Sequence, residues 1–242
     1  MIEIKGVTKS FQDNKVLRGV DLTIETGETI AVIGRSGCGK SVLLKIIVGL
    51  LQADDGTVNI DGQLVGGLPE AELYKLRRRF GFLFQGAALF DSMTVEENIA
   101  LPIVENEYDW SEEFLKKKIA EKLELVGLEG IEKLKPSELS GGMKKRVGLA
   151  RALITEPDFI LYDEPTTGLD PISSDNIDDV IKALSGRLNA TSIVVTHDMF
   201  TVKNVVDRVA MLHEGKVYFV GTPEKLLASD DDVIKEFIKR TD

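Results

Sequence analysis

Residues 34–41 read Gly34-Arg35-Ser36-Gly37-Cys38-Gly39-Lys40-Ser41, which fits the pattern G-x-x-x-x-G-K-S/T without a gap. The apolar run at 29–33 predicts a buried parallel strand before this loop, and the leucine-rich pattern at 43–50 predicts a helix after it. Glycines in such a loop let consecutive backbone N–H groups turn inward around a polyphosphate. Lys40 is expected to neutralise the β- and γ-phosphates, and the Ser41 hydroxyl to ligate Mg²⁺. The stretch therefore predicts an α/β fold built around a phosphate-binding loop.

The composition limits the classes of protein to consider. The chain has 242 residues, of which 43% are hydrophobic and 29% charged, the balance of a globular protein. Its 30 basic and 40 acidic residues give a net charge of −10, which argues against a protein that grips nucleic-acid phosphates. No stretch is long enough for a membrane span, and the N-terminus lacks the features of a signal peptide. We therefore expect a cytoplasmic protein with no nucleic-acid partner, which touches a membrane only through other proteins.

The single cysteine, Cys38, excludes a disulfide framework and a cysteine-based metal cage. It occupies a free position of the phosphate loop, where two interpretations apply. The simpler one is a small residue that fits the loop. The alternative is a reactive thiol beside the nucleotide.

The periodicity of the chain predicts one α/β domain with a helical insertion. Besides 29–33, the expected strands are 2–5, 20–24, 57–60, 80–84, 158–162, 192–195, 207–213 and 216–220. The expected helices are 94–105, 112–126, 141–154, 173–187 and two short ones from Pro223, with Asp109 and Glu112 as an N-cap pair. We expect the core and a β subdomain to occupy about 1–85 and 157–242, and a helical subdomain about 86–156.

Two polar strand ends are expected to face the phosphate loop. An apolar strand ends at Asp163-Glu164, and another is followed by His197. Because ligands bind at the carboxyl ends of parallel strands, Asp163 is expected to hold Mg²⁺, and Glu164 to deprotonate the attacking water. His197 is positioned to reach a γ-phosphate oxygen or that water. A lone Asp-Glu pair is often only a solvated strand end, but the phosphate loop upstream favours the catalytic interpretation.

Five motifs together carry a family resemblance. Leu139-Ser140-Gly141-Gly142-Met143 lies 20 residues before the acidic strand, between Gln85 and Gly168-Leu169-Asp170. With the phosphate loop and His197, this set resembles the nucleotide-binding cassette of ABC ATPases over essentially the whole chain. The resemblance implies a P-loop NTPase fold, with a RecA-like core, an antiparallel β subdomain and an inserted α-helical subdomain. It also implies hydrolysis of ATP to ADP and phosphate with Mg²⁺.

The resemblance implies a role for each matching residue. The ATP-binding set would be Phe11, Val16, Gly34, Arg35, Ser36, Gly37, Cys38, Gly39, Lys40 and Ser41, with Phe11 stacked on adenine. The metal would be held by Ser41, Gln85 and Asp163, and catalysis would rest on Glu164 and His197. In a head-to-tail homodimer, Ser140, Gly141 and Gly142 would contact the partner's ATP, and Asp170 would couple the two sites. Met143 departs from the family, because many cassettes carry glutamine there.

A finer resemblance concerns the substrate. Residues 81–95 and 139–147 look like the phospholipid-transporter ATPases of the lipid-asymmetry type, which work with MCE-domain proteins. This implies two permease subunits, an MCE-domain partner and a place on the cytoplasmic face of the inner membrane. Leu89, Phe90 and Met93 would form an apolar seat for the permease, or else ordinary core. The alternatives are a cassette for another solute, such as an amino acid or a metal, and a non-transport ABC protein acting on ribosomes or DNA.

Overall fold

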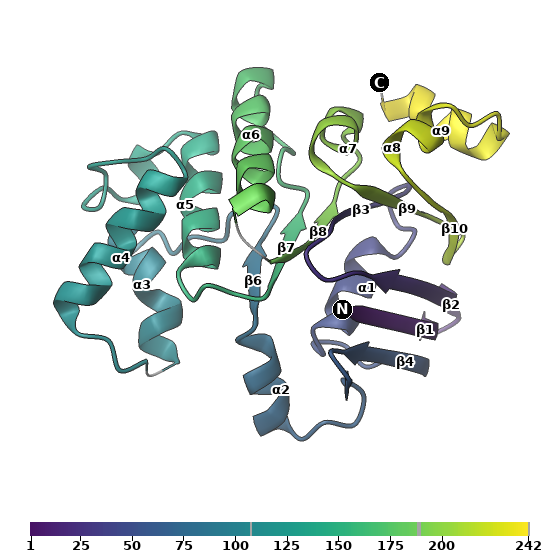
Figure 1. The fold of residues 1–242 in the computed structure, drawn as a ribbon, viewed down its shortest axis with the longest axis horizontal. Coiled ribbons are helices and arrows are strands. Elements are labelled where there is room, and N and C mark those ends of the chain that lie inside the picture. The colour runs from purple at the N-terminus through teal and green to yellow at the C-terminus, as the bar shows by residue number, and fades with distance from the viewer. Residues whose placement is uncertain (107, 188–189, 242) are drawn as a thin grey trace.

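The larger sheet of the fold is mixed and has the strand order β10-β9-β3-β8-β7-β6 (Figure 1). The computed structural model describes residues 1–106, 108–187 and 190–241. The strands of this sheet are β3 (Thr29–Ile33), β6 (Phe80–Leu83), β7 (Phe159–Asp163), β8 (Thr191–Val195), β9 (Arg208–His213) and β10 (Lys216–Gly221). Strands β9, β3, β8, β7 and β6 pair in parallel, and β10 is antiparallel to β9. The carboxyl ends of the parallel strands therefore meet at one edge, where a ligand site is expected.

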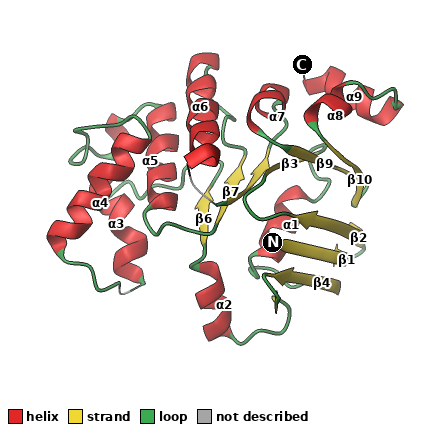
Figure 2. Cartoon of the chain, viewed as in Figure 1, coloured by secondary structure: helices red, strands yellow, loops and turns green. Residues whose placement is uncertain are grey.

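A smaller antiparallel sheet has the order β2-β1-β4-β5. Its strands are β1 (Ile2–Phe11), β2 (Asn14–Ile24), β4 (Asp55–Ile60) and β5 (Gln63–Leu64). The helices are α1 (Lys40–Ile47), α2 (Glu70–Arg77), α3 (Val95–Glu105), α4 (Glu112–Leu125), α5 (Gly141–Leu153), α6 (Pro171–Arg187), α7 (Met199–Val205), α8 (Pro223–Leu227) and α9 (Asp232–Thr241), with a 3₁₀ turn at Pro136–Glu138. Figure 2 shows α3, α4 and α5 grouped beside the β6 edge, and the smaller sheet on the other side of the molecule.

The buried strands explain why the sequence folds in this way. Every residue of β3 and β8 is buried, as expected for parallel strands covered on both faces. One hydrophobic cluster joins α1 to the smaller sheet, and another joins α3, α4 and α5 to the larger sheet. The strands and helices expected from periodicity are confirmed within about three residues at their ends, except that β1 and β2 each extend six residues beyond the expected ranges 2–5 and 20–24. Helices α2 and α7 and the short strand β5 were not predicted.

The expected cap of α4 is wrong. The N-cap is Ser111, whose hydroxyl accepts a hydrogen bond from the backbone N–H of Phe114 at 3.2 Å. Asp109 lies two residues before the cap, outside the helix. A serine hydroxyl satisfies the free N–H groups of a first turn as well as a carboxylate does, so Ser111 fills the role that was expected of Asp109.

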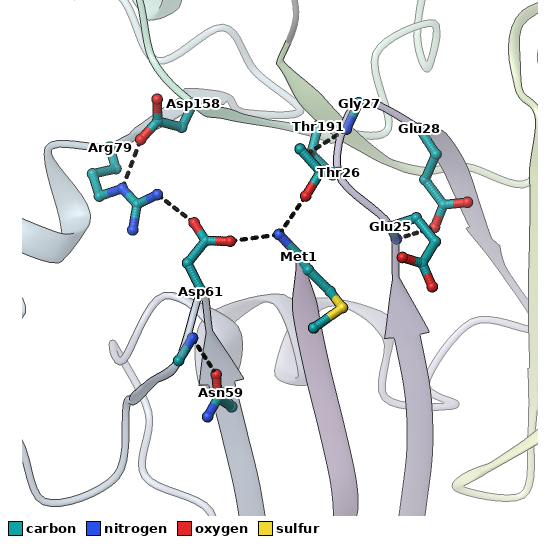
Figure 3. A network of polar contacts seen from close by, with 11 residues as sticks. Met1, Glu25, Thr26, Gly27, Glu28, Asn59, Asp61, Arg79, Asp158 and Thr191 are labelled. Atoms are coloured by element: carbon teal, nitrogen blue, oxygen red, sulfur yellow. Dashed lines mark hydrogen bonds and ion pairs between the residues drawn. The ribbon is translucent and has the colours of Figure 1, made fainter.

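A chain of polar contacts links the two sheets (Figure 3). The amino group of Met1 contacts the carboxylate of Asp61 at 2.6 Å, and the Arg79 guanidinium lies between Asp61 and Asp158. The hydrogen bonds from Met1 and Arg79 lower the pKa of Asp61. Because these side chains are partly exposed, each pair contributes at most about 1 kcal/mol. The contacts fix the orientation of β4 relative to β7 more than they stabilise the fold.

Helices α6 and α7 meet at a buried carboxyl group, that of Asp178. The Thr201 hydroxyl lies 3.0 and 2.9 Å from its two oxygens, and the residue is 2% exposed. Burial raises the pKa of Asp178 from 3.8 to about 7, and the charges of Asp198 and Asp175 act in the same direction. Between these pH values the folded chain binds a proton that the unfolded chain has lost, so the free energy of unfolding falls as the pH rises from about 4 to 7.

We therefore expect Asp178→Asn to stabilise the chain at pH 8, by up to about 4 kcal/mol, because the amide keeps the contact with Thr201 without a buried charge. The gain should vanish below about pH 3, where Asp178 is protonated in both states. Urea unfolding at several pH values measures this difference. Asp179→Asn, an exposed neighbour on α6, is the matched control and should change stability by less than about 0.5 kcal/mol. Equal stability of Asp178→Asn and the unaltered chain at pH 8 would contradict the expectation.

Candidate functional site

The phosphate loop joins β3 to α1 and is held by close backbone packing. Gly34 and Gly39 have φ of 148° and 106°. A Cβ on Gly34 would lie 2.4 Å from the carbonyl oxygen of Leu212, and one on Gly39 would lie 2.6 Å from the Leu17 side chain. Glycine is therefore required at both positions. The ammonium of Lys40 donates to the carbonyl oxygen of Gly34 at 2.7 Å, which keeps its charge inside the curve of the loop.

A cavity of about 910 Å³ lies over this loop. Its lining residues are Phe11, Val16, Gly34, Arg35, Ser36, Gly37, Gly39, Lys40, Ser41, Val42, Gln85, Asp163, Glu164, Thr167, His197 and Phe237. The cavity thus brings together nearly all the residues that sequence analysis assigned to ATP, metal and catalysis. Cys38 is not among the lining residues. The volume and the mixture of aromatic, basic and acidic side chains suit a nucleotide.

Cys38 lies half-buried inside the loop. Burial raises the pKa of its thiol, and the nearby charge of Lys40 opposes this only in part. Because the thiolate is the reactive form, a raised pKa makes the group less reactive at neutral pH. This favours the interpretation of Cys38 as a small residue that fits the loop.

Glu164 follows directly after β7 and is held at several atoms. Its backbone has φ of 50°, and its N–H donates to the carbonyl oxygen of Val195 at 2.8 Å. Its carboxylate accepts a hydrogen bond from the Thr167 hydroxyl at 3.0 Å and lies 2.7 Å from Nδ1 of His197. The Glu164 side chain is 15% exposed and that of His197 is 56% exposed. The carboxylate is thus oriented from two sides at the edge of the cavity.

The neighbouring Asp163 belongs to a set of hard oxygen donors. Burial raises the pKa of Asp163, and the charge of Glu164 raises it further, whereas Lys40 opposes this. A carboxylate whose charge is disfavoured in this way is stabilised by a cation. The hydroxyl of Ser41 and the amide of Gln85 line the same cavity, so the donor set fits Mg²⁺. Within the described ranges no three His, Cys, Asp or Glu side chains could hold a metal by themselves, so such an ion would depend on phosphate oxygens as well.

The residues expected to act across a dimer do not line this cavity. Ser140 is exposed and caps α5, accepting a hydrogen bond from the N–H of Met143 at 3.2 Å. A Cβ on Gly142 would lie 3.2 Å from Ser173, so the start of α5 packs closely against that of α6. Asp170 accepts two hydrogen bonds from Ser173, which lower its pKa. Within one chain, these residues form a surface separate from the phosphate loop.

Three residues of the cavity were missed in the sequence, namely Val42, Thr167 and Phe237. The position of Thr167, three residues after Glu164, is typical of a hydroxyl that bonds back across a turn, and this signal was available. Phe237 comes from α9, about 200 residues after the loop, and nothing in the local pattern indicated it. Helix α9 also contacts the loop through an ion pair between Arg35 and Glu236 at 2.7 Å. Both partners are about half exposed, so this pair contributes less than about 1 kcal/mol.

Residues 17–167 match the sequence profile of the ABC transporter family. The chain belongs to this family. It is 42% identical to the intermembrane phospholipid transport system ATP-binding protein MlaF of Haemophilus influenzae, over 99% of this chain and 90% of that protein. It is also 42% identical to the probable ribonucleotide transport ATP-binding protein mkl of Mycobacterium leprae, over 98% of this chain and 68% of that protein. It spans 66% of the corresponding protein of Mycobacterium tuberculosis.

A solved structure also supports the assignment of this chain to the ABC transporter family. The ATP-binding cassette MJ0796, described as a dimer in a post-hydrolysis state bound to ADP and Pi, superposes with a TM-score of 0.84 at 35% identity, over 92% of this chain and 99% of that one. The predicted P-loop NTPase fold and the predicted ATPase activity are confirmed for this ABC chain. Among the described residues, none of the helices has the length and apolar character needed to cross a membrane.

Proposed function

We propose that this ABC ATPase hydrolyses ATP at the interface of a homodimer and thereby powers phospholipid transport between bacterial membranes. One observation carries the hydrolytic part: Glu164 and His197, 2.7 Å apart, face the same cavity as the phosphate loop. The identity to the Haemophilus influenzae phospholipid transport protein, over nearly the full length of both chains, supports the lipid part. Relatives of similar identity are named for methionine import and ribonucleotide transport, so the substrate is the finer part of the proposal.

In the proposed mechanism each group of the cavity has one task. Lys40 and the loop N–H groups hold the β- and γ-phosphates, while Phe11, which is 46% exposed, stacks on adenine with Val16 beside it. Glu164 accepts the proton of the attacking water, and His197 orients the water or the γ-phosphate. Ser41, Gln85 and Asp163 hold Mg²⁺, which neutralises phosphate charge when bound.

The dimer completes each site. Ser140, Gly141 and Gly142 lie at the start of α5, where the first two are exposed. They contact the γ-phosphate held by the partner's loop, because the N–H groups of a helix terminus favour an anion. Asp170, which caps α6 beside them, couples the two ATP sites. We assign the core and β subdomain to about 1–85 and 157–242 and the helical subdomain to about 86–156. Closure on ATP then brings the helical subdomain of one chain against the loop of the other.

A groove beside β6 is the proposed contact with the membrane subunits. It has a volume of about 370 Å³ and is lined by Phe80, Gly81, Phe82, Phe84, Ala88, Phe90, Leu101, Pro102, Arg151, Ala152 and Thr155. Phe90 was expected in an apolar seat and lines the groove, whereas Leu89 packs against the hydrophobic core and Met93 is outside the lining. The segment after Gln85 is held by the Arg151 guanidinium, which donates to the carbonyls of Ala87 and Ala88.

The proposed complex contains two such ATPase chains, two integral membrane permease subunits and an MCE-domain lipid-binding protein. The ATPase lies on the cytoplasmic face of the inner membrane and contacts the membrane indirectly. Its net charge of −10 disfavours direct contact with anionic lipid. Co-purification from detergent-solubilised membranes tests this: an MCE-domain protein and bound phospholipid support the proposal, and a periplasmic amino-acid or metal receptor would contradict the lipid assignment.

The groove gives a sharper prediction. Phe90→Asp is expected to abolish recovery of the permease with the tagged chain, because it places a charge in an apolar contact and Phe90 is 51% exposed. The ATPase rate of the isolated chain should remain within about twofold, since Phe90 does not line the ATP cavity. Phe114→Asp, on α4 and 42% exposed, is the matched control. Permease recovery equal to that of the unaltered chain would exclude the groove as the docking site.

A further inference from the structure

Lys145, in the second turn of α5, has its charged group inside the protein. The residue is 4% exposed, and its ammonium donates a hydrogen bond to the backbone carbonyl oxygen of Glu164 at 3.0 Å. Burial lowers the pKa of Lys145, while the charges of Asp163 and Glu164 oppose this. The next residue, Arg146, instead reaches the carbonyls of Val126 and Gly127. The two neighbouring basic residues of α5 therefore contact different parts of the backbone.

The backbone that Lys145 contacts is in an unfavourable conformation. Glu164 has φ of 50°, a left-handed conformation that costs a residue with a Cβ roughly 1–2 kcal/mol. Its N–H is fixed by Val195 at 2.8 Å and its carbonyl oxygen by Lys145. Held on both sides, the backbone directs the carboxylate toward Thr167 and His197. Strained backbone of this kind persists at functional sites because the surroundings hold it.

Helix α5 carries both Lys145 and the start of the exposed surface at Ser140. The two residues are five positions apart, which is about 8 Å along a helix axis. The helix packs tightly against β6, because a Cβ on Gly148 would lie 3.1 Å from Leu83. A close-packed helix transmits a displacement along its length. A movement of α5 at Ser140 therefore also moves the Lys145 ammonium relative to the carbonyl oxygen of Glu164.

We propose that Lys145 is a positioning residue that fixes the backbone of Glu164, so that the same helix which meets the partner's ATP also sets the orientation of the general base. This rests on the proposed role of Glu164. Lys145 does not line the cavity and acts only through Glu164. The consequence is that hydrolysis responds to the position of α5, while binding of ATP to the loop does not.

The test compares steady-state ATP hydrolysis by the full chain and three variants. Lys145→Met keeps the apolar stem and removes the donor. It is expected to lower kcat at least about tenfold with the KM for ATP within about twofold, because the loss falls on the reaction step. Lys145→Gln retains an N–H donor, so its kcat is expected to be at least about threefold higher than that of Lys145→Met. Lys122→Met is the matched control, since Lys122 is also buried, at 8% exposure, but pairs with Glu156 at 3.2 Å.

Each outcome decides the inference. A kcat of Lys145→Met equal to that of Lys122→Met would overturn it, and so would a raised KM at unchanged kcat. Lys145→Leu takes the place of Lys145→Met, with the same readouts, if circular dichroism shows the latter unfolded. Glu164→Gln is measured in parallel: if it is inactive while Lys145→Met is fully active, the role of Lys145 fails and that of Glu164 stands. If Glu164→Gln itself turns over ATP normally, the proposed base fails independently of Lys145.

Discussion

Glu164→Gln is expected to lower ATP turnover at least about 100-fold while ATP still binds. The amide has the shape of the carboxylate, so the contact with Thr167 at 3.0 Å can persist. It cannot accept a proton from water, which removes the step assigned to this group. The phosphate loop and Phe11 are unchanged in this variant, so the proposed contacts that bind ATP remain. ATP should therefore hold the dimer closed instead of being consumed.

Two measurements check this expectation. Gel filtration with and without ATP should show an ATP-dependent dimer for Glu164→Gln, and phosphate release should show the loss of turnover. Glu214→Gln is the control, because Glu214 is an exposed glutamate with φ of 48° at a hairpin turn, close to the 50° of Glu164. It should hydrolyse ATP at the unaltered rate. Normal hydrolysis by Glu164→Gln would show that the proton is accepted elsewhere.

The parts of the site that could be predicted are those fixed by local chemistry. The phosphate loop requires glycines where φ and close packing exclude a side chain, as at Gly34 and Gly39. Its pattern can therefore be recognised from eight consecutive residues of the sequence. The strand ends at Asp163 and His197 were predictable because a buried parallel strand leaves a run of apolar residues that stops where the polar edge begins. Both the glycine pattern of the loop and the ends of the apolar runs depend only on residues that are close together in the sequence.

The parts that were missed depend on tertiary contacts. Lys145 lies in the run Lys144-Lys145-Arg146, which in sequence is indistinguishable from a solvated helix face, and only the packing of α5 turns it toward Glu164. Phe237 belongs to an amphipathic helix, and its pattern does not say that the apolar face covers a cavity formed by residues 34–41. Helix α2 was missed because it is short and largely polar, with Leu76 as its buried residue. Periodicity is weak where few residues are buried.

The proposed sharing of each ATP between two chains has a direct test in mixed dimers. Lys40→Met removes the charge of the loop, and Ser140→Asp places a negative charge where the partner's γ-phosphate is expected, while aspartate still serves as the N-cap of α5. In either homodimer both sites are damaged, so we expect hydrolysis to fall at least about 100-fold. In a mixed dimer both defects fall in one site, and the other site combines an intact loop with an intact Ser140.

Mixing the two inactive variants is therefore expected to restore hydrolysis, to at most about one quarter of the unaltered rate, because random pairing gives half mixed dimers with one intact site each. The rate is followed after co-refolding or co-expression at equal amounts. Ser137→Asp, an exposed serine before the cap, is the control and should be active alone. If the mixture is no more active than its two components, loop and Ser140 act within the same chain. That result would contradict the proposed shared site, which is supported by the exposure of Ser140 and its position outside the residues that line the cavity of one chain.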